Sequence, residues 1–185
     1  MLFLILGIVL IFTVIILFSF PQFSPIPYFP SNMKDKDLIL EALRTDRTDL
    51  IIDLGAGDGT VIFEAAKEAY AHQSPTRFIA LELNPVLVII LHLRRLFHPH
   101  RKNIRIVWGD MFKIKYAKIL KNIKHHRMTV YLYISPWLIE QAVSHIGPHA
   151  KDARYVSYFY PIKSMRKFES AQKGVHTVFS YSPKS

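Results

Sequence analysis

Short hydrophobic runs alternate with longer segments of mixed polarity along this chain of 185 residues. Five runs have the length of a β-strand, and segments with apolar residues at every third or fourth position, typical of helices, separate most of them. The strand-like runs cover residues 50–54, 77–82, 104–110, 129–134 and 153–160. Strands and helices in this order are typical of α/β folds with a mostly parallel sheet.

The segments between and after these runs predict the remaining elements. Helices are expected over residues 34–43, 60–68, 84–97 and 138–146, with a partly helical connection over 113–126. Residues 165–171 and 175–181 predict two further strands, joined by a turn that ends at Gly174. These two strands are expected to form an antiparallel hairpin at the end of the chain.

The first residues form the longest apolar run. Residues 2–20 carry no charge, and this length of helix spans about 28 Å, close to the hydrocarbon thickness of a bilayer. A cleaved signal peptide is disfavoured, because the run lacks a basic start and a small-residue cleavage site. Lys34 and Lys36 follow the run and nothing basic precedes it. The positive-inside rule therefore predicts one transmembrane helix, with the rest of the chain on the cytoplasmic side of the membrane.

The segment after this run is rich in proline. Four prolines lie between residues 21 and 30, which predicts an extended spacer rather than a helix. The predicted organisation is an anchor over residues 1–20, a linker over 21–33 and one folded domain over 34–185.

Composition restricts the chemistry. The chain has no cysteine, which excludes disulfides and thiolate metal sites, and its nine histidines form no set with metal-binding spacing. No metal is therefore expected. The formal net charge of +10 favours anionic partners such as phospholipid headgroups, nucleic acid or acidic proteins, without selecting one of them.

A glycine-rich stretch follows the first predicted strand of the domain. Gly55, Gly57 and Gly59 alternate with other residues, and Asp53 precedes them by two positions. Glycine permits positive φ and close approach of a ligand to the backbone, and the following helix presents free N–H groups. A dinucleotide fingerprint would place its third glycine three positions after the second, so the spacing disfavours that cofactor.

The pattern D-x-G-x-G-x-G after a strand resembles motif I of the class I S-adenosylmethionine-dependent methyltransferases. The resemblance implies S-adenosylmethionine as cofactor and a Rossmann-like, mostly parallel seven-stranded α/β sheet with helices on both faces. The antiparallel hairpin at the end of the chain is the usual finish of that sheet. A glycine turn without a ligand is the alternative.

Acidic residues end three successive predicted strands, at Asp53, Glu82 and Asp110. The carboxyl ends of parallel strands meet at one edge of the sheet, where ligands bind. Glu82 is expected to accept hydrogen bonds from the two ribose hydroxyls, and Asp110 from the adenine amine, with Met111 against the ring. The alternatives are an acid at a helix start for Glu82 and a turn residue for Asp110.

The fourth strand is expected to supply the acceptor side of the site. Tyr133, Ser135, Pro136 and Trp137 lie where methyltransferases that act on amino groups carry motif IV. The nucleic-acid members of that group have a second proline, and here Trp137 takes its place, which disfavours a nucleic-acid substrate. Trp137 and the tyrosines of the strand are expected to contact an amine through cation–π interactions, unless the tyrosines are only core residues.

A closer resemblance covers nearly the whole chain. It rests on the apolar N-terminus, the segment Pro27-Tyr28-Phe29-Pro30-Ser31, the glycine-rich stretch and Leu81-Glu82-Leu83-Asn84-Pro85. These features resemble the small membrane-anchored protein-lysine methyltransferases that modify the c-ring protein of ATP synthase. The resemblance implies that Tyr28 and Ser31 close over the cofactor, unless their segment is only a spacer.

The expected cofactor-binding residues are Tyr28, Ser31, Asp53, Gly55, Ala56, Gly57, Asp58, Glu82, Leu83, Asn84, Asp110 and Met111. The expected function is methylation of a lysine in a membrane-associated protein, with the membrane itself as a partner through residues 2–20. One alternative keeps the cofactor and methylates a lipid, a quinone, another small molecule or RNA. The other is a catalytically silent cofactor-binding domain tethered to the membrane.

Overall fold

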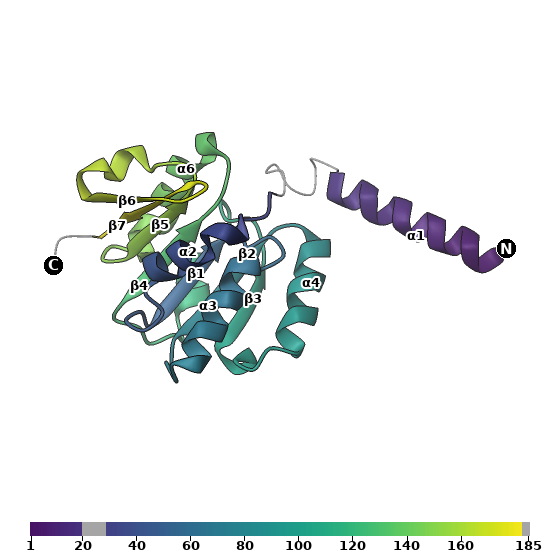
Figure 1. Ribbon diagram of the computed structural model, residues 1–185, viewed down its shortest axis with the longest axis horizontal. Coiled ribbons are helices and arrows are strands. Elements are labelled where there is room, and N and C mark those ends of the chain that lie inside the picture. Colours follow the sequence, from purple (N-terminus) through teal and green to yellow (C-terminus); the bar gives the residue numbers. More distant parts are fainter. Residues whose placement is uncertain (20–28, 183–185) are drawn as a thin grey trace.

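A seven-stranded sheet forms the centre of the domain in the computed structural model, which describes residues 1–19 and 29–182 (Figure 1). Its strand order is β3-β2-β1-β4-β5-β7-β6, and β7 pairs antiparallel with both of its neighbours while the other pairs are parallel. The strands are β1 (Leu50–Leu54), β2 (Arg77–Glu82), β3 (Ile104–Trp108), β4 (Met128–Leu132), β5 (Arg154–Tyr158), β6 (Glu169–Lys173) and β7 (Thr177–Tyr181). The predicted Rossmann-like α/β sheet and its closing antiparallel hairpin are confirmed.

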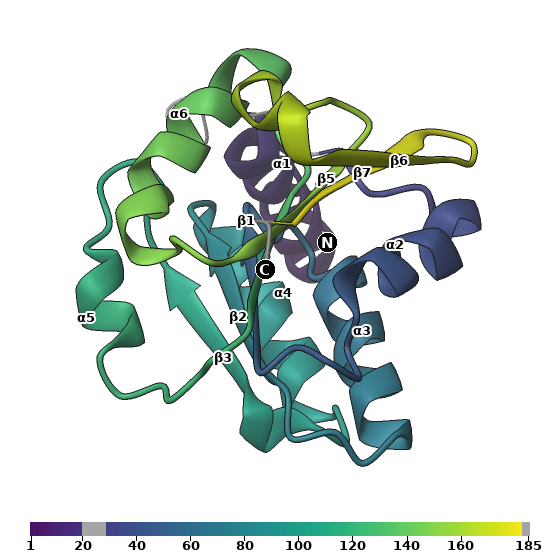
Figure 2. The same cartoon turned by 90° about the vertical axis from the view of Figure 1, so that its left-hand side faces the viewer.

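Helices cover both faces of the sheet (Figure 2). One face carries α2 (Lys36–Leu43), α3 (Thr60–Ala71) and α4 (Pro85–Leu96), and the other carries α5 (Tyr116–Leu120) and α6 (Pro136–Ile146). Alternate residues of the strands point to each side, so a separate hydrophobic core forms on each face. Every residue of the central strands β1 and β4 is buried, because each has a strand on either side and helices above and below.

The N-terminal helix α1 (Leu2–Ser19) extends away from the domain, on the side of α4 (Figure 1). It contains no charged residue. Within residues 1–19 and 29–182, no helix combines the length and the apolar character that crossing a membrane requires. The transmembrane helix expected over residues 2–20 is therefore not found in the described part of the chain.

Most element boundaries differ from the predicted ones by a few residues, and the C-terminal hairpin differs most. Residues Lys163–Phe168 form a 3-10 helix where the sixth strand was expected to begin, and β6 continues to Lys173. The turn therefore lies at residues 174–176. Its position is set by a distant residue, Asp35, whose carboxylate accepts hydrogen bonds from the N–H groups of Val175 and His176.

Candidate active site

The glycine-rich turn between β1 and α3 adopts a conformation that other residues rarely adopt. Gly55, Gly57 and Gly59 have φ angles of 85°, 59° and 81°. A Cβ atom on Gly59 would lie 2.5 Å from a methyl group of Leu91 on α4. The positive φ angles expected of these glycines are confirmed, and the turn also packs closely against α4.

Glu82 fixes this turn from the neighbouring strand. One carboxylate oxygen accepts a hydrogen bond of 2.8 Å from the Gly57 N–H. The other accepts from the N–H groups of Leu83 and Asn84, at 2.8 and 2.7 Å. A carboxylate oxygen accepts about two hydrogen bonds, so the oxygen bound to Gly57 keeps acceptor capacity for a ligand hydroxyl. Glu82 therefore shapes the turn as well as lining the site.

Asp53 lies beneath the turn among other negative charges. Its side chain is only 3% exposed. Burial raises the pKa of Asp53 well above its ordinary value, and the nearby carboxylates of Glu82 and Asp58 raise it further. A positively charged ligand group at this position would favour the ionised form of Asp53. In the register of the sheet, Asp53 lies opposite Tyr131 of β4.

Asp58 and Asn84, both expected to bind the cofactor, use their side chains to fix the local structure. The Asp58 carboxylate accepts hydrogen bonds from Thr60 at the start of α3 and from Arg94 of α4, the latter at 2.8 Å. The Asn84 side chain accepts from the N–H groups of Val86 and Leu87 and caps α4. Both residues hold the helices that flank the turn.

The segment after β3 lies at the same edge of the sheet. Asp110 accepts a hydrogen bond from the Phe112 N–H, and Lys113 approaches its other oxygen at 3.5 Å. Met111 is buried, and its terminal methyl group lies 3.2 Å from where a Cβ of Gly55 would be. The structure therefore places Met111 against the glycine turn, with Asp110 directly before it in the chain. Asp110 was expected to end the third strand, but β3 ends two residues earlier, at Trp108.

The residues expected on the acceptor side follow β4. Tyr133 packs edge-on against Tyr158 with ring centroids 4.9 Å apart, and burial raises its pKa. Ser135 and Pro136 form the start of α6, and Trp137 in its first turn is 75% exposed. These side chains follow the carboxyl end of β4, which pairs in parallel with β1, the strand that carries Asp53. An exposed indole is available to contact an incoming substrate.

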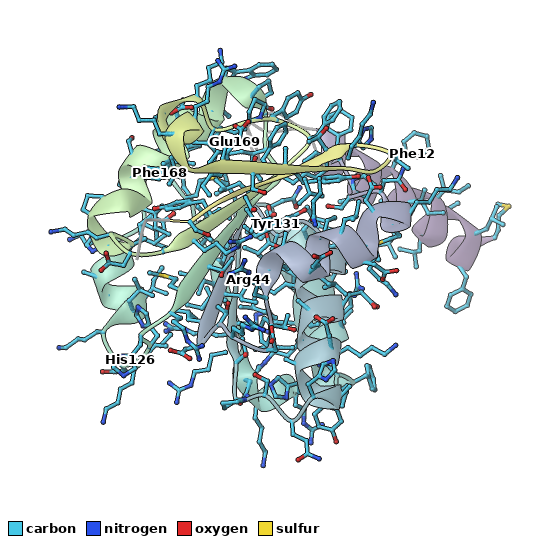
Figure 3. The ribbon with its side chains drawn as sticks, turned by 60° about the vertical axis from the view of Figure 1, so that its left-hand side comes forward. Phe12, Arg44, His126, Tyr131, Phe168 and Glu169 are labelled. Carbon is cyan, nitrogen blue, oxygen red and sulfur yellow. The ribbon has the colours of Figure 1, made fainter. Side chains whose placement is uncertain are left out.

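The N-terminal segment reaches the same region. The Ser31 hydroxyl lies 3.2 Å from the hydroxyl of Tyr131, one hundred residues later in the chain. Figure 3 shows Tyr131 near the middle of the molecule. Burial and the nearby Asp53 raise the pKa of Tyr131 well above its ordinary value. Ser31 thus contacts the end of β4 next to Asp53, and its contact with the cofactor stays a prediction. Tyr28 lies outside the described residues.

Sequence reasoning missed Asp35, which is 2% exposed in the segment before α2. It accepts hydrogen bonds from the Tyr158 hydroxyl and from the backbone of Val175 and His176, at 2.7 to 2.8 Å. Burial raises its pKa, but these hydrogen bonds outweigh burial and lower the pKa overall. Asp35 joins the N-terminal segment, β5 and the C-terminal hairpin. Its sequence context, between Lys34 and Lys36, resembles an ordinary exposed helix start and gives no sign of this role.

The described residues fit S-adenosylmethionine. Its cationic methionine end would meet the negative charges of Asp53 and Glu82 and the bare backbone of the glycine turn. The acceptor capacity of Glu82 suits a ribose hydroxyl, and Asp110 and Met111 suit an adenine ring. Among residues 1–19 and 29–182, no group of three or more metal-binding side chains is present.

No protein-family model matches the sequence. The ATP synthase c-subunit lysine N-methyltransferase of Xenopus laevis is 25% identical over 157 residues, which are 84% of this chain and 63% of that protein. A probable ribosomal RNA small subunit methyltransferase A of Methanosarcina barkeri is 33% identical over 92 residues, which are 48% of this chain and 29% of that protein. The crystal structure of an RNA methyltransferase from Salinibacter ruber with S-adenosyl-L-homocysteine has a TM-score of 0.63 and 21% identity, and the match covers 85% of this chain and 95% of that one.

These comparisons confirm the fold and the resemblance that the motifs predicted. The chain has the fold of the S-adenosylmethionine-dependent methyltransferases, and its resemblance to the lysine methyltransferases of ATP synthase extends over most of its length. The chain spans less than two thirds of the length of the lysine methyltransferases it matches.

Proposed function

We propose that this chain is an S-adenosylmethionine-dependent methyltransferase that methylates a lysine side chain of a membrane-associated protein. The observation that carries the proposal is the arrangement at the carboxyl edge of the sheet, where Asp53, Glu82 and Met111 surround the glycine turn. Asp110 directly precedes Met111. The sequence similarity to named lysine methyltransferases supports the acceptor class.

The residues of the chain would bind and position the reactants. When bound, the cofactor supplies a methyl group already activated by its sulfonium, so no metal is required. Asp53 and Glu82 would hold the cofactor, and Tyr133 and Trp137 would surround the amine of the acceptor. An aromatic, partly desolvated pocket disfavours the charged ammonium and so favours the neutral amine, which is the nucleophile. The protein then contributes mainly alignment of the two reacting groups.

Membrane association through α1 is part of the proposal. Its described side chains include Phe3, Leu4 and Phe12, all more than half exposed, and it carries no charge. Exposed apolar surface of this kind favours contact with lipid. Such contact would hold the site near substrates at the membrane and raise their effective concentration. A location of the domain on the cytoplasmic side, which the basic residues Lys34 and Lys36 favour, is part of the same proposal.

RNA is the second candidate acceptor. It is supported by the similarity to a probable ribosomal RNA methyltransferase and by the net charge of +10. The absence of the second proline after Ser135 and Pro136 disfavours it.

Transfer of a tritiated methyl group in membrane fractions tests the acceptor. The full chain is incubated with labelled S-adenosylmethionine, and each sample is divided among protease, nuclease and organic solvent extraction. The proposal expects label that resists nuclease and solvent but is lost on protease treatment, and that is recovered as methyl-lysine after hydrolysis. Label that partitions into solvent, or that nuclease releases, identifies a different acceptor and refutes the lysine proposal.

A further inference from the structure

The outward face of α4 is apolar, although it faces away from the core. Leu87, Val88 and Leu91 of this helix are buried against the sheet. On the opposite side, an outer stripe of four side chains is exposed by 56% to 84%, with the spacing of one helix face. The outer stripe consists of Ile89, Leu93, Leu96 and Phe97. A surface helix ordinarily presents polar residues on this side, so the stripe requires an explanation.

The stripe ends in a basic cavity. A pocket of about 650 Å³ lies at the C-terminal end of α4, and Leu96 and Phe97 belong to both the stripe and the pocket wall. The remaining wall is formed by Tyr70, His98, Pro99, His100, Arg101, Lys102 and Asn103, with no acidic residue among these lining side chains. A continuous surface thus combines exposed hydrocarbon with cationic groups.

This combination matches the chemistry of a phospholipid. Apolar side chains favour the acyl region of a bilayer, and arginine and lysine favour its phosphate groups. The neighbouring helix α1, which is also apolar and uncharged, contacts α4 and leaves the domain on the same side (Figure 1). One bilayer can therefore contact both apolar helices.

We propose that the outer stripe of α4 docks on an anionic phospholipid bilayer, with headgroup phosphates at Arg101 and Lys102. This contact is separate from α1 and independent of the methyl-transfer proposal. The helix α4 is about 18 Å long and begins at Pro85, close to Glu82, so docking holds the candidate site beside the membrane surface. The domain is then held in one orientation relative to the bilayer.

The absence of cysteine allows this contact to be measured at one position in the full chain. His92, exposed on the outer side of α4, is replaced by cysteine and labelled with a polarity-sensitive fluorophore. Ser144, exposed on α6 at the opposite face of the sheet, is replaced and labelled in the same way as the matched control. Vesicles of phosphatidylcholine, with or without phosphatidylglycerol and with brominated acyl chains, serve as the probe.

The proposal expects quenching and a blue shift of the label at position 92, larger with phosphatidylglycerol, and neither effect at position 144. In the His92→Cys background, Leu93→Glu with Leu96→Glu should abolish the quenching. Phe168→Glu should not, because Phe168 directly precedes β6, at the edge of the sheet opposite to β3, against which α4 packs. Arg101→Ala with Lys102→Ala should weaken the response to phosphatidylglycerol roughly fivefold for each charge removed.

Circular dichroism checks that each variant is folded. The proposal is refuted if the label at position 92 is unquenched on vesicles that sediment the protein, or if positions 92 and 144 respond equally. It is also refuted if the folded chain does not bind the vesicles, or if the double glutamate variant is quenched as strongly as its parent.

Discussion

The carboxylate of Glu82 accepts a hydrogen bond of 2.8 Å from the backbone N–H of Gly57, across two adjacent strands. The same carboxylate holds the start of the β2–α4 connection through Leu83 and Asn84. Glu82 was expected only to bind the ribose, but it also supports the turn that we expect to meet the methionine end of the cofactor. Loss of this carboxylate should therefore lower both the stability of the fold and the affinity for S-adenosylmethionine.

Glu82→Gln tests this double role. The amide retains one acceptor oxygen but presents an N–H₂ group to a backbone N–H, so at least one buried donor loses its partner. We expect a decrease of about 1 to 3 kcal/mol in the free energy of unfolding, measured by urea denaturation. Affinity for S-adenosylmethionine should fall roughly tenfold or more. Glu41→Gln, at an exposed position of α2, should change neither quantity. Unaltered binding by folded Glu82→Gln protein contradicts the assigned role.

Gly59→Ala tests the geometry of the turn. The alanine Cβ would meet Leu91 and Phe63 at 2.5 to 2.6 Å, in a backbone conformation with φ of 81°. We expect a loss of about 2 to 4 kcal/mol in the free energy of unfolding. The matched control is Gly147→Ala, because Gly147 has a helical backbone and no atom within 4 Å of the added group. Equal stability of the two variants in thermal or urea unfolding would contradict the positive φ and the close packing of Gly59.

Asp53→Asn tests the electrostatics of the site. Burial and the neighbouring carboxylates raise the pKa of Asp53 above the ordinary value of 3.8, so the folded state binds this proton more tightly than the unfolded state. The contribution of Asp53 to stability is therefore largest below pH 3.8 and is lost as the pH rises through the folded pKa. The asparagine variant should be more stable than the parent protein at neutral pH, in urea denaturation across a pH series.

Asp35 provides the contrast, because its pKa is lowered from 3.8 in the folded state. Its stabilising contribution is present above pH 3.8 and is lost as the pH falls through the lower, folded pKa. Asp35→Asn should therefore destabilise the protein at neutral pH, in the same titration. If Asp53→Asn and Asp35→Asn change the stability in the same direction at neutral pH, the opposite pKa shifts of the two acids are disproved.

Trp137→Ala tests the acceptor side. The side chain is 75% exposed, so the free energy of unfolding should change by less than about 0.5 kcal/mol. Methyl transfer should fall roughly five- to tenfold through loss of contact with the amine, while binding of S-adenosylmethionine is retained. Trp137→Phe should recover part of the activity, and Phe168→Ala, at another exposed aromatic residue, should leave it unchanged. Full activity of Trp137→Ala excludes the indole from acceptor binding.

The sequence predicts those parts of the site that follow from local patterns. Asp53 and Glu82 could be assigned because apolar strands end near them, and the glycine turn because its spacing is specific. The structural contacts of Asp58 and Asn84 were not predicted, and their contact with the cofactor stays a prediction. The Asn84 side chain caps α4, and the Asp58 carboxylate accepts hydrogen bonds from Thr60 at the start of α3 and from Arg94, thirty-six residues later in the chain.

The features that the sequence did not predict depend on contacts between distant segments. The C-terminal turn is held by Asp35, which lies about 140 residues earlier in the chain. The periodicity of the two strands alone therefore predicts the wrong residues for this turn. The same carboxylate binds Tyr158 of β5. No pattern within a short window identifies such a residue, because its neighbours Lys34 and Lys36 give it the appearance of an exposed charge.

Calorimetric titration of the purified full chain with S-adenosylmethionine tests the central claim most directly. We expect one cofactor molecule to bind each chain, with affinity reduced roughly tenfold or more in Asp53→Asn through loss of a charge-assisted contact, and unchanged in Asp46→Asn, an exposed acid outside the site. Circular dichroism and urea unfolding establish that each protein is folded. A folded parent chain that does not bind S-adenosylmethionine would contradict the account, as would equal binding by the parent chain and Asp53→Asn.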